Sequence, residues 1–141
     1  MLSYHADMDA QTNPFELGLD RLVNLDIDAE FIGKAALRRI RDDGVRRKQV
    51  GLVLDIDPLE RPNTEFWPIL KDAARIGKVT SAVFSPRLGK TIALAMVDTD
   101  RAVIGNDVQV LLDNRLVRAE VVERPFYDPK KSLATGTPQV A

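Results

Sequence analysis

The stretch Thr80–Val97, TSAVFSPRLGKTIALAMV, decides the fold class of this chain of 141 residues. It holds one run of β-favouring residues, a Phe-Ser-Pro turn, a Leu-Gly break and a second run in which large and small apolar residues alternate. Period-two alternation is typical of a strand, and small residues opposite large ones indicate a strand that is covered on both faces or that lines a tight barrel. The stretch therefore predicts two neighbouring strands joined by a fixed turn.

Short runs of the same kind recur on both sides of this stretch. Together the runs cover residues 50–56, 76–84, 92–97, 108–112 and 117–121. Asp113 and Asn114, between the last two runs, tolerate positive φ and predict a tight hairpin. Short antiparallel strands at regular spacing indicate a small barrel or a sandwich. We expect a mainly β chain with a Greek-key-like barrel of six to seven strands over residues 46–127. Trp67 is expected to plug the barrel or to contact a neighbouring domain, next to an edge strand that breaks at Pro68.

Residues 1–45 have a different texture of helix and loop. Apolar residues recur every four positions and predict an amphipathic helix over residues 29–43, with Asp28 as its N-cap and Gly44 just past its end. Its outer face is expected to carry Lys34, Arg38, Arg39 and Arg41. The segment 21–25 predicts a short strand. At the other end of the chain, residues 128–141 lack a pattern and predict a flexible tail.

Composition excludes several classes of function. The chain is 45% hydrophobic and 29% charged, which predicts a packed core rather than disorder. Its 20 basic and 21 acidic residues balance to a net charge of −1, so neither nucleic acid nor a membrane surface is an expected partner. There is no cysteine, which fits a cytoplasmic protein, and the lone His5 cannot build a metal site. We expect no metal and no transmembrane helix.

Five segments carry a resemblance to a known family, and they occur in that family's own order. They are Ser3–Asp9, Asn13–Leu19, Asp28–Leu37, Thr80–Val97 and Arg124–Pro129. The chain resembles the C-terminal portion of the glycine-cleavage T-protein (aminomethyltransferase) family, which includes dimethylsulfoniopropionate demethylase. Ala82 departs from the family's usual glycine. Arg21 stands where aminomethyltransferases often carry tryptophan, which is nearer to the demethylase branch.

The resemblance implies a tetrahydrofolate-dependent transfer of an aminomethyl or methyl group. It also implies that residues 1–45 are the end of a folate-binding domain whose larger N-terminal part, with the aspartate that acts in transfer, is missing. We therefore expect no catalytic residue here, an inactive chain and weak or no folate binding without that part. The missing domain and folate are the expected partners, and the apolar surface left exposed is a candidate homodimer interface. The candidate cofactor-binding residues are Tyr4, Arg21, Tyr127 and Lys130, with Lys131 beside the last.

Each candidate also has a plainer interpretation. Tyr4 fits a packing tyrosine, Arg21 fits a surface arginine, and the residues from Tyr127 onward fit a solvated terminus. Asp7 and Asp9 are better explained as loop caps than as an acid pair, and Ser85 lacks a base and fits a turn. The alternative function is a non-catalytic barrel module that serves assembly, substrate gating or regulatory folate binding. The one-carbon donor stays open.

Overall fold

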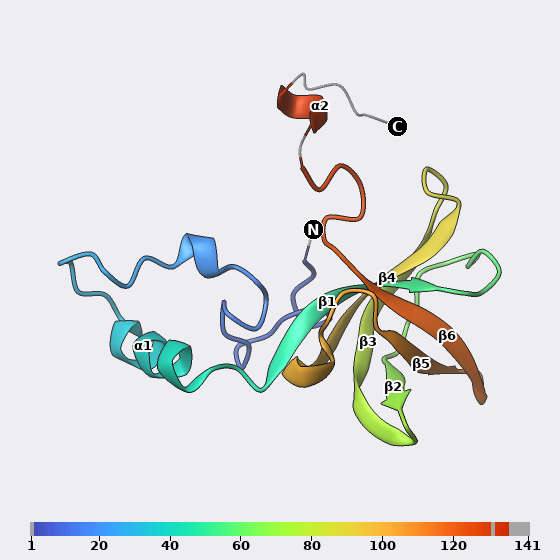
Figure 1. Ribbon diagram of the computed structural model, residues 1–141, viewed down its shortest axis with the longest axis horizontal. Helices are drawn as coiled ribbons and strands as arrows, with labels where there is room; N and C mark the ends of the chain where they lie inside the picture. Colours follow the sequence, from blue (N-terminus) through green and yellow to red (C-terminus); the bar gives the residue numbers. More distant parts are fainter. Residues whose placement is uncertain (1, 131, 136–141) are drawn as a thin grey trace.

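The computed structural model describes residues 2–130 and 132–135, and it consists of a β-barrel with an extended arm on one side (Figure 1). The arm, residues 2–45, contains the 3-10 helix η1 (Asp20–Leu22) and the helix α1 (Lys34–Asp43). The barrel, residues 46–127, is made of six strands. The strands are β1 (Arg47–Leu54), β2 (Trp67–Lys71), β3 (Ala74–Ser85), β4 (Lys90–Asp98), β5 (Asp107–Leu112) and β6 (Arg115–Val122), with the 3-10 helix η2 (Thr99–Arg101) after β4.

The six strands close into an antiparallel barrel in the order β1-β4-β3-β2-β5-β6. Strands β2, β3 and β4 follow one another as hairpins, and the long connection after β1 places β1 beside β4, which is a Greek-key arrangement. The predicted fold class is confirmed. The predicted hairpin at Asp113 and Asn114 also forms, with φ of 47° and 61°. The prediction of an edge strand broken at Pro68 was wrong. Pro68 lies within β2, and β2 pairs with β3 on one side and β5 on the other.

The barrel interior is filled by alternate residues of all six strands. The least exposed are Leu52, Ile69, Val79, Ala95, Val97, Val110, Ala119 and Val121. Trp67 lies in the same cluster, as predicted. The small side chains of the buried alanines on β4 take little room in the barrel interior. Gly77 on β3 is needed because β4 lies close to it: a Cβ atom there would lie 2.2 Å from the Met96 carbonyl oxygen. Burial of this continuous apolar cluster is the main stabilising term of the fold.

The arm departs from prediction at the start of its helix and in the segment 21–25. Helix α1 begins at Lys34 rather than at residue 29, because Gly33 turns the chain with φ of 93° directly before it. The predicted N-cap Asp28 was therefore wrong, and Gly33 occupies that position. The segment 21–25 does not form a strand, and η1 occupies its start. Gly44 ends α1 as expected, with φ of 78°.

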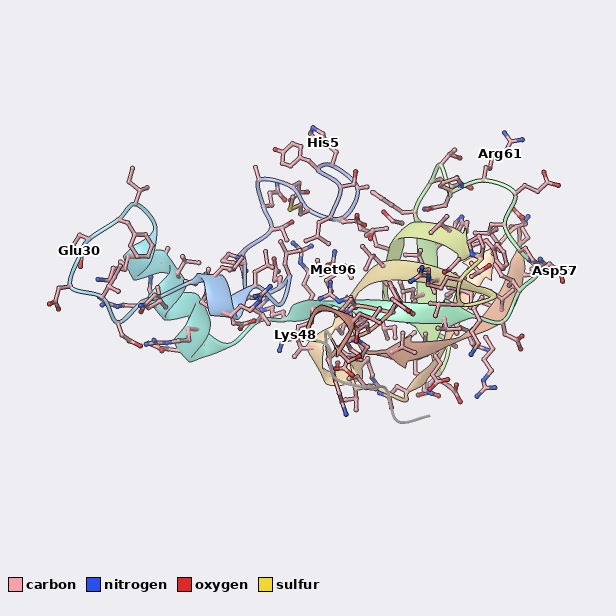
Figure 2. All side chains as sticks on the ribbon, turned by 90° about the horizontal axis from the view of Figure 1, so that it is seen from above. His5, Glu30, Lys48, Asp57, Arg61 and Met96 are labelled. Atoms are coloured by element: carbon pink, nitrogen blue, oxygen red, sulfur yellow. The ribbon has the colours of Figure 1, made fainter. Side chains whose placement is uncertain are left out.

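Lys34 was wrongly placed on the outer face of the helix, since only 2% of it is exposed. Its ammonium donates to the carbonyl oxygens of Ile27 at 2.6 Å and Ala29 at 3.0 Å, and to the Glu30 carboxylate at 3.2 Å. The loop before α1 is therefore folded around a lysine ammonium. Glu30 marks this tip of the arm, far from the barrel (Figure 2).

The described part of the predicted tail contains one helical turn, α2 (Ser132–Thr135). The Asp128 carboxylate accepts hydrogen bonds from the Ser132 and Leu133 backbone N–H groups at 2.7 and 3.0 Å. Residues 131 and 136–141 of the tail lie outside the described residues.

Candidate functional site

A cavity of about 1140 Å³ lies where the arm meets the barrel. One wall comes from the arm, a second from the loop before β2, and the floor from the outer faces of β3 and β4. The segment that follows β6 closes one end. The lining residues are Leu2, Ser3, Ala6, Asp7, Leu17, Gly18, Leu19, Arg21, Pro62, Asn63, Thr80, Ser81, Ala82, Val83, Ile92, Ala93, Leu94, Arg124, Pro125 and Phe126. His5 and Arg61, labelled in Figure 2, are the sequence neighbours of the arm wall and the loop wall.

The walls of the cavity are mostly apolar, with a few charged groups among them. On the floor, Ser81 pairs with Leu94 and Val83 pairs with Ile92 across β3 and β4. Because these residues alternate with the inward-facing ones, their side chains face away from the barrel core. A concave apolar surface with a few convergent polar groups is the usual form of a small-molecule site.

Asp7 joins the arm to the barrel at this cavity, and only 3% of it is exposed. Its Oδ1 atom accepts hydrogen bonds from the Thr80 and Ser81 hydroxyls at 2.6 and 2.7 Å, and its Oδ2 atom accepts one from the Ser3 backbone N–H at 2.9 Å. Two consecutive residues of a regular strand face opposite sides, but a register shift between Val79 and Ser81 breaks this alternation. The bulge therefore lets both hydroxyls reach one carboxylate.

Arg124 lines the same cavity at the seam between arm and barrel, and Gln49 links it to Asp7, since the Gln49 side-chain nitrogen donates to the Asp7 carbonyl oxygen at 3.2 Å. Its guanidinium donates hydrogen bonds to the Gln49 side-chain oxygen and, at 3.2 Å, to the Leu17 carbonyl oxygen. Two glycines leave room for it, because a Cβ atom on Gly18 would lie 3.3 Å from its Nη2 atom and one on Gly51 would lie 3.0 Å from its Cγ atom. Burial lowers the pKa of Arg124, and the nearby Asp7 charge partly offsets this.

Two further polar groups fix the arm at its base. Glu16, 8% exposed, accepts a hydrogen bond from the Arg47 guanidinium at 2.7 Å, and this bond raises the pKa of Arg47. The Gln49 backbone N–H donates to the Glu16 carbonyl oxygen at 2.7 Å. Asp9 instead caps its own loop: the hydrogen bond from the Thr12 hydroxyl, and then that from the Gln11 backbone, lowers the pKa of Asp9.

The structure brings only one of the four predicted cofactor-binding residues to the cavity wall. Arg21, on η1, is exposed and lines the cavity. Tyr4 is 58% exposed and packs edge-on against His5, although its neighbour Ser3 lines the cavity. Tyr127 is 42% exposed, with the Arg87 guanidinium 4.5 Å above its ring.

Lys130 is exposed at the start of the tail and is not part of the cavity lining, and Lys131 lies outside the described residues. Asp7 was predicted to be a loop cap, which it is, but its bonds to barrel hydroxyls more than 70 residues away in sequence were missed. Arg124 was noticed only as part of a resemblance. A cation directly after an apolar strand is the sequence signal that could have indicated it.

Residues 2–130 and 132–135 contain no group of three or more His, Cys, Asp or Glu side chains arranged to hold a metal ion. In that same part of the chain, no helix has the length and apolar character needed to cross a membrane. Ser85 does not line the cavity, and its hydroxyl accepts a weak hydrogen bond from the Leu88 backbone N–H at 3.4 Å, as a turn residue does.

Comparison with known proteins identifies the barrel. Residues 47–128 match the family model of the glycine cleavage T-protein C-terminal barrel domain. The chain belongs to the T-protein family. The T-protein barrel and its arm superpose on the glycine cleavage system aminomethyltransferase T of Bartonella henselae with a TM-score of 0.79 and 25% sequence identity, over 89% of this chain and 35% of that one.

Sequence relatives of this T-protein chain are named aminomethyltransferases. That of Synechococcus sp. strain RCC307 is 44% identical over 124 residues, which cover 88% of this chain and 34% of the relative. That of Thermosynechococcus vestitus is 42% identical over 134 residues, which cover 95% of this chain and 36% of the relative. The chain thus spans about a third of the length of the curated relatives it matches.

Proposed function

We propose that this chain is the C-terminal portion of a tetrahydrofolate-dependent one-carbon transferase, and that its arm and barrel close over the bound folate. The observation that carries the proposal is the cavity between arm and barrel in a chain of the T-protein family. Relatives with the name aminomethyltransferase match across the arm as well as the barrel, since the match covers 88% or more of the chain.

The residues around the cavity suit a folate. Its apolar floor, with Val83, Ile92 and Leu94, offers contact to an aromatic ring, and Arg21 and Arg124 offer positive charge to carboxylates. Tyr4 and Tyr127 are exposed rings whose sequence neighbours Ser3 and Phe126 line the cavity, and Lys130 is an exposed cation that follows Tyr127. Tetrahydrofolate supplies the nitrogen that accepts the one-carbon unit. The chain's own residues bind it, orient it and exclude water.

The arm also supports a partner for this chain. Leu22, Ile27, Phe31 and Ile32 expose 67%, 41%, 40% and 104% of their surfaces, all on the arm. Exposed apolar residues that gather in one region mark an interaction site. Because relatives are about three times as long, we propose that the family's preceding folate-binding part covers this surface. Without it, the same surface is free to join two copies of the chain.

The experiment compares the chain alone with the chain mixed with the part of the Synechococcus relative that precedes the matched segment. We expect no one-carbon transfer to tetrahydrofolate by the chain alone, and transfer above background in the mixture, because only the mixture holds both sides of the folate site. Calorimetric titration with tetrahydrofolate measures binding in each sample, and light scattering measures self-association.

Transfer by the isolated chain would contradict the proposal that the folate site needs a further part of the protein. Saturable folate binding by the chain without transfer in either sample would instead support the alternative, a regulatory folate-binding barrel. An absence of both binding and transfer in the mixture would refute the proposed function, provided that light scattering detects the two parts associated.

A further inference from the structure

Arg124 differs from the other partly buried arginines of the described residues, Arg47 and Arg101. Arg47, Arg118, Arg101 and Arg41 each form an ion pair with an aspartate or glutamate. Arg124 is partly buried, yet within residues 2–130 and 132–135 its hydrogen-bond acceptors are two neutral oxygens, on Gln49 and Leu17. Arg38 also donates to a neutral oxygen, on Leu25 at 2.9 Å, but Arg38 is exposed. Burying a cation costs free energy unless an anion pairs with it.

The nearest candidate counter-ion is already engaged. Asp7 is close enough to Arg124 to oppose the fall in its pKa. Its carboxylate is nevertheless directed to the Thr80 and Ser81 hydroxyls and the Ser3 backbone N–H, and it forms no ion pair with Arg124 among the described residues. Both carboxylate oxygens of Asp7 therefore have hydrogen-bond donors other than the guanidinium. The charge of Arg124 is therefore left for another partner.

The position of Arg124 shows where that partner binds. The guanidinium is held from two sides, by the barrel through Gln49 and by the arm through Leu17, so it is fixed where it lines the cavity. Arg21 lines the same cavity and makes no ion pair within the described part of the chain. A guanidinium fixed in a plane favours a carboxylate, which it can bind through two parallel hydrogen bonds.

We propose that Arg124 is the anchor of a carboxylate-binding subsite at the arm–barrel seam, with Arg21 as a second, exposed cation. The subsite recognises the carboxylate group of an organic ligand. It rests on the proposed function for the identity of that ligand: the carboxylate comes either from the glutamate tail of a folate or from a small aliphatic one-carbon donor.

The test uses the full chain, labelled with ¹⁵N, and follows the Arg124 Nε–H resonance by NMR. The probes are para-aminobenzoylglutamate, its uncharged diamide, and a short aliphatic carboxylate, propionate. We expect a saturable shift with one of the two carboxylates and none with the diamide. The Arg124→Gln variant should weaken binding about tenfold or more, because it removes a charge-assisted bidentate contact. Arg39→Gln, on the exposed side of α1, is the matched control and should bind as the parent does.

Arg124→Lys keeps the charge but not the planar fork, so it should bind at an affinity between the parent and Arg124→Gln. It also replaces the glutamine variant if that one fails to fold by circular dichroism. A response to para-aminobenzoylglutamate assigns the carboxylate to the folate tail, and a response to propionate alone assigns it to the donor.

The subsite is refuted if neither carboxylate shifts the Arg124 resonance at millimolar concentration, or if the Arg124 variants bind as tightly as Arg39→Gln does. This result is separate from the fate of the proposed function. Transfer activity in the two-part mixture with no carboxylate binding at Arg124 would leave the function and remove the subsite. Carboxylate binding at Arg124 with no transfer in the mixture would leave the subsite and remove the proposed function.

Discussion

The barrel and the arm of this chain are stabilised in different ways. The barrel closes on itself, and sixteen buried residues of its core form one cluster inside it. The arm has three buried apolar residues, Phe15, Leu17 and Leu25, and is joined to the barrel by polar contacts through Asp7, Glu16 and Arg124. The barrel buries its own apolar cluster, whereas the tip of the arm leaves large apolar side chains exposed. The arm is therefore the part of the chain on which the proposed partner would bind.

The largest expected difference between barrel and arm is in the effect of replacing an isoleucine in each. Ile69 in β2 is 0% exposed and Ile32 on the arm is 104% exposed. We expect Ile69→Ala to lower the free energy of unfolding by about 2–5 kcal/mol, because it removes buried methylene groups and leaves a cavity. Ile32→Ala should change it by less than about 0.5 kcal/mol. Urea denaturation of both variants checks this, and a large loss for Ile32→Ala would show that the arm tip packs in solution.

Two aspartates of one segment test the contact between arm and barrel. Asp7→Ala strips the Thr80 and Ser81 hydroxyls of their acceptor, so we expect the arm to open more easily by about 2 kcal/mol while the barrel stays folded. Asp9→Ala affects only its own exposed loop and serves as the control. Hydrogen exchange should become faster at the His5 and Gln49 amides, which bond within and to the arm. Equal protection in both variants would mean that Asp7 does not hold the arm.

Most of the barrel could be predicted from sequence because its information is local. Period-two alternation and the Asp113-Asn114 turn are set by neighbouring residues, and the structure follows them. The arm could not be predicted as well. The start of α1 depends on Gly33 and on a loop that folds back to cover Lys34, which helical periodicity alone places on the surface.

The candidate site was the least predictable part, because it is made by contacts between distant segments. Asp7 meets Thr80 only because a bulge in β3 turns two consecutive hydroxyls to one side, and no local pattern encodes that pairing. Arg21 was predicted from a resemblance and does line the cavity, whereas Lys130 does not. Whether Tyr4, Arg21, Tyr127 and Lys130 contact a folate stays a prediction.

The smallest expected effect is the difference in coupling energy between a partly buried ion pair and an exposed one. The Glu16–Arg47 pair joins arm to barrel, with side chains 10% and 42% exposed, while the Asp107–Arg118 pair lies within the barrel, with side chains 49% and 67% exposed. Double-mutant cycles with Glu16→Gln and Arg47→Gln should give a coupling of about 1 kcal/mol, since partial burial reduces screening, and the exposed pair should give less than about 0.5 kcal/mol. Added salt should weaken the exposed pair more. If the two couplings are equal, the base of the arm is as solvated as the barrel surface, and the arm must be held by the Asp7 and Arg124 contacts together with the Gln49–Glu16 backbone hydrogen bond.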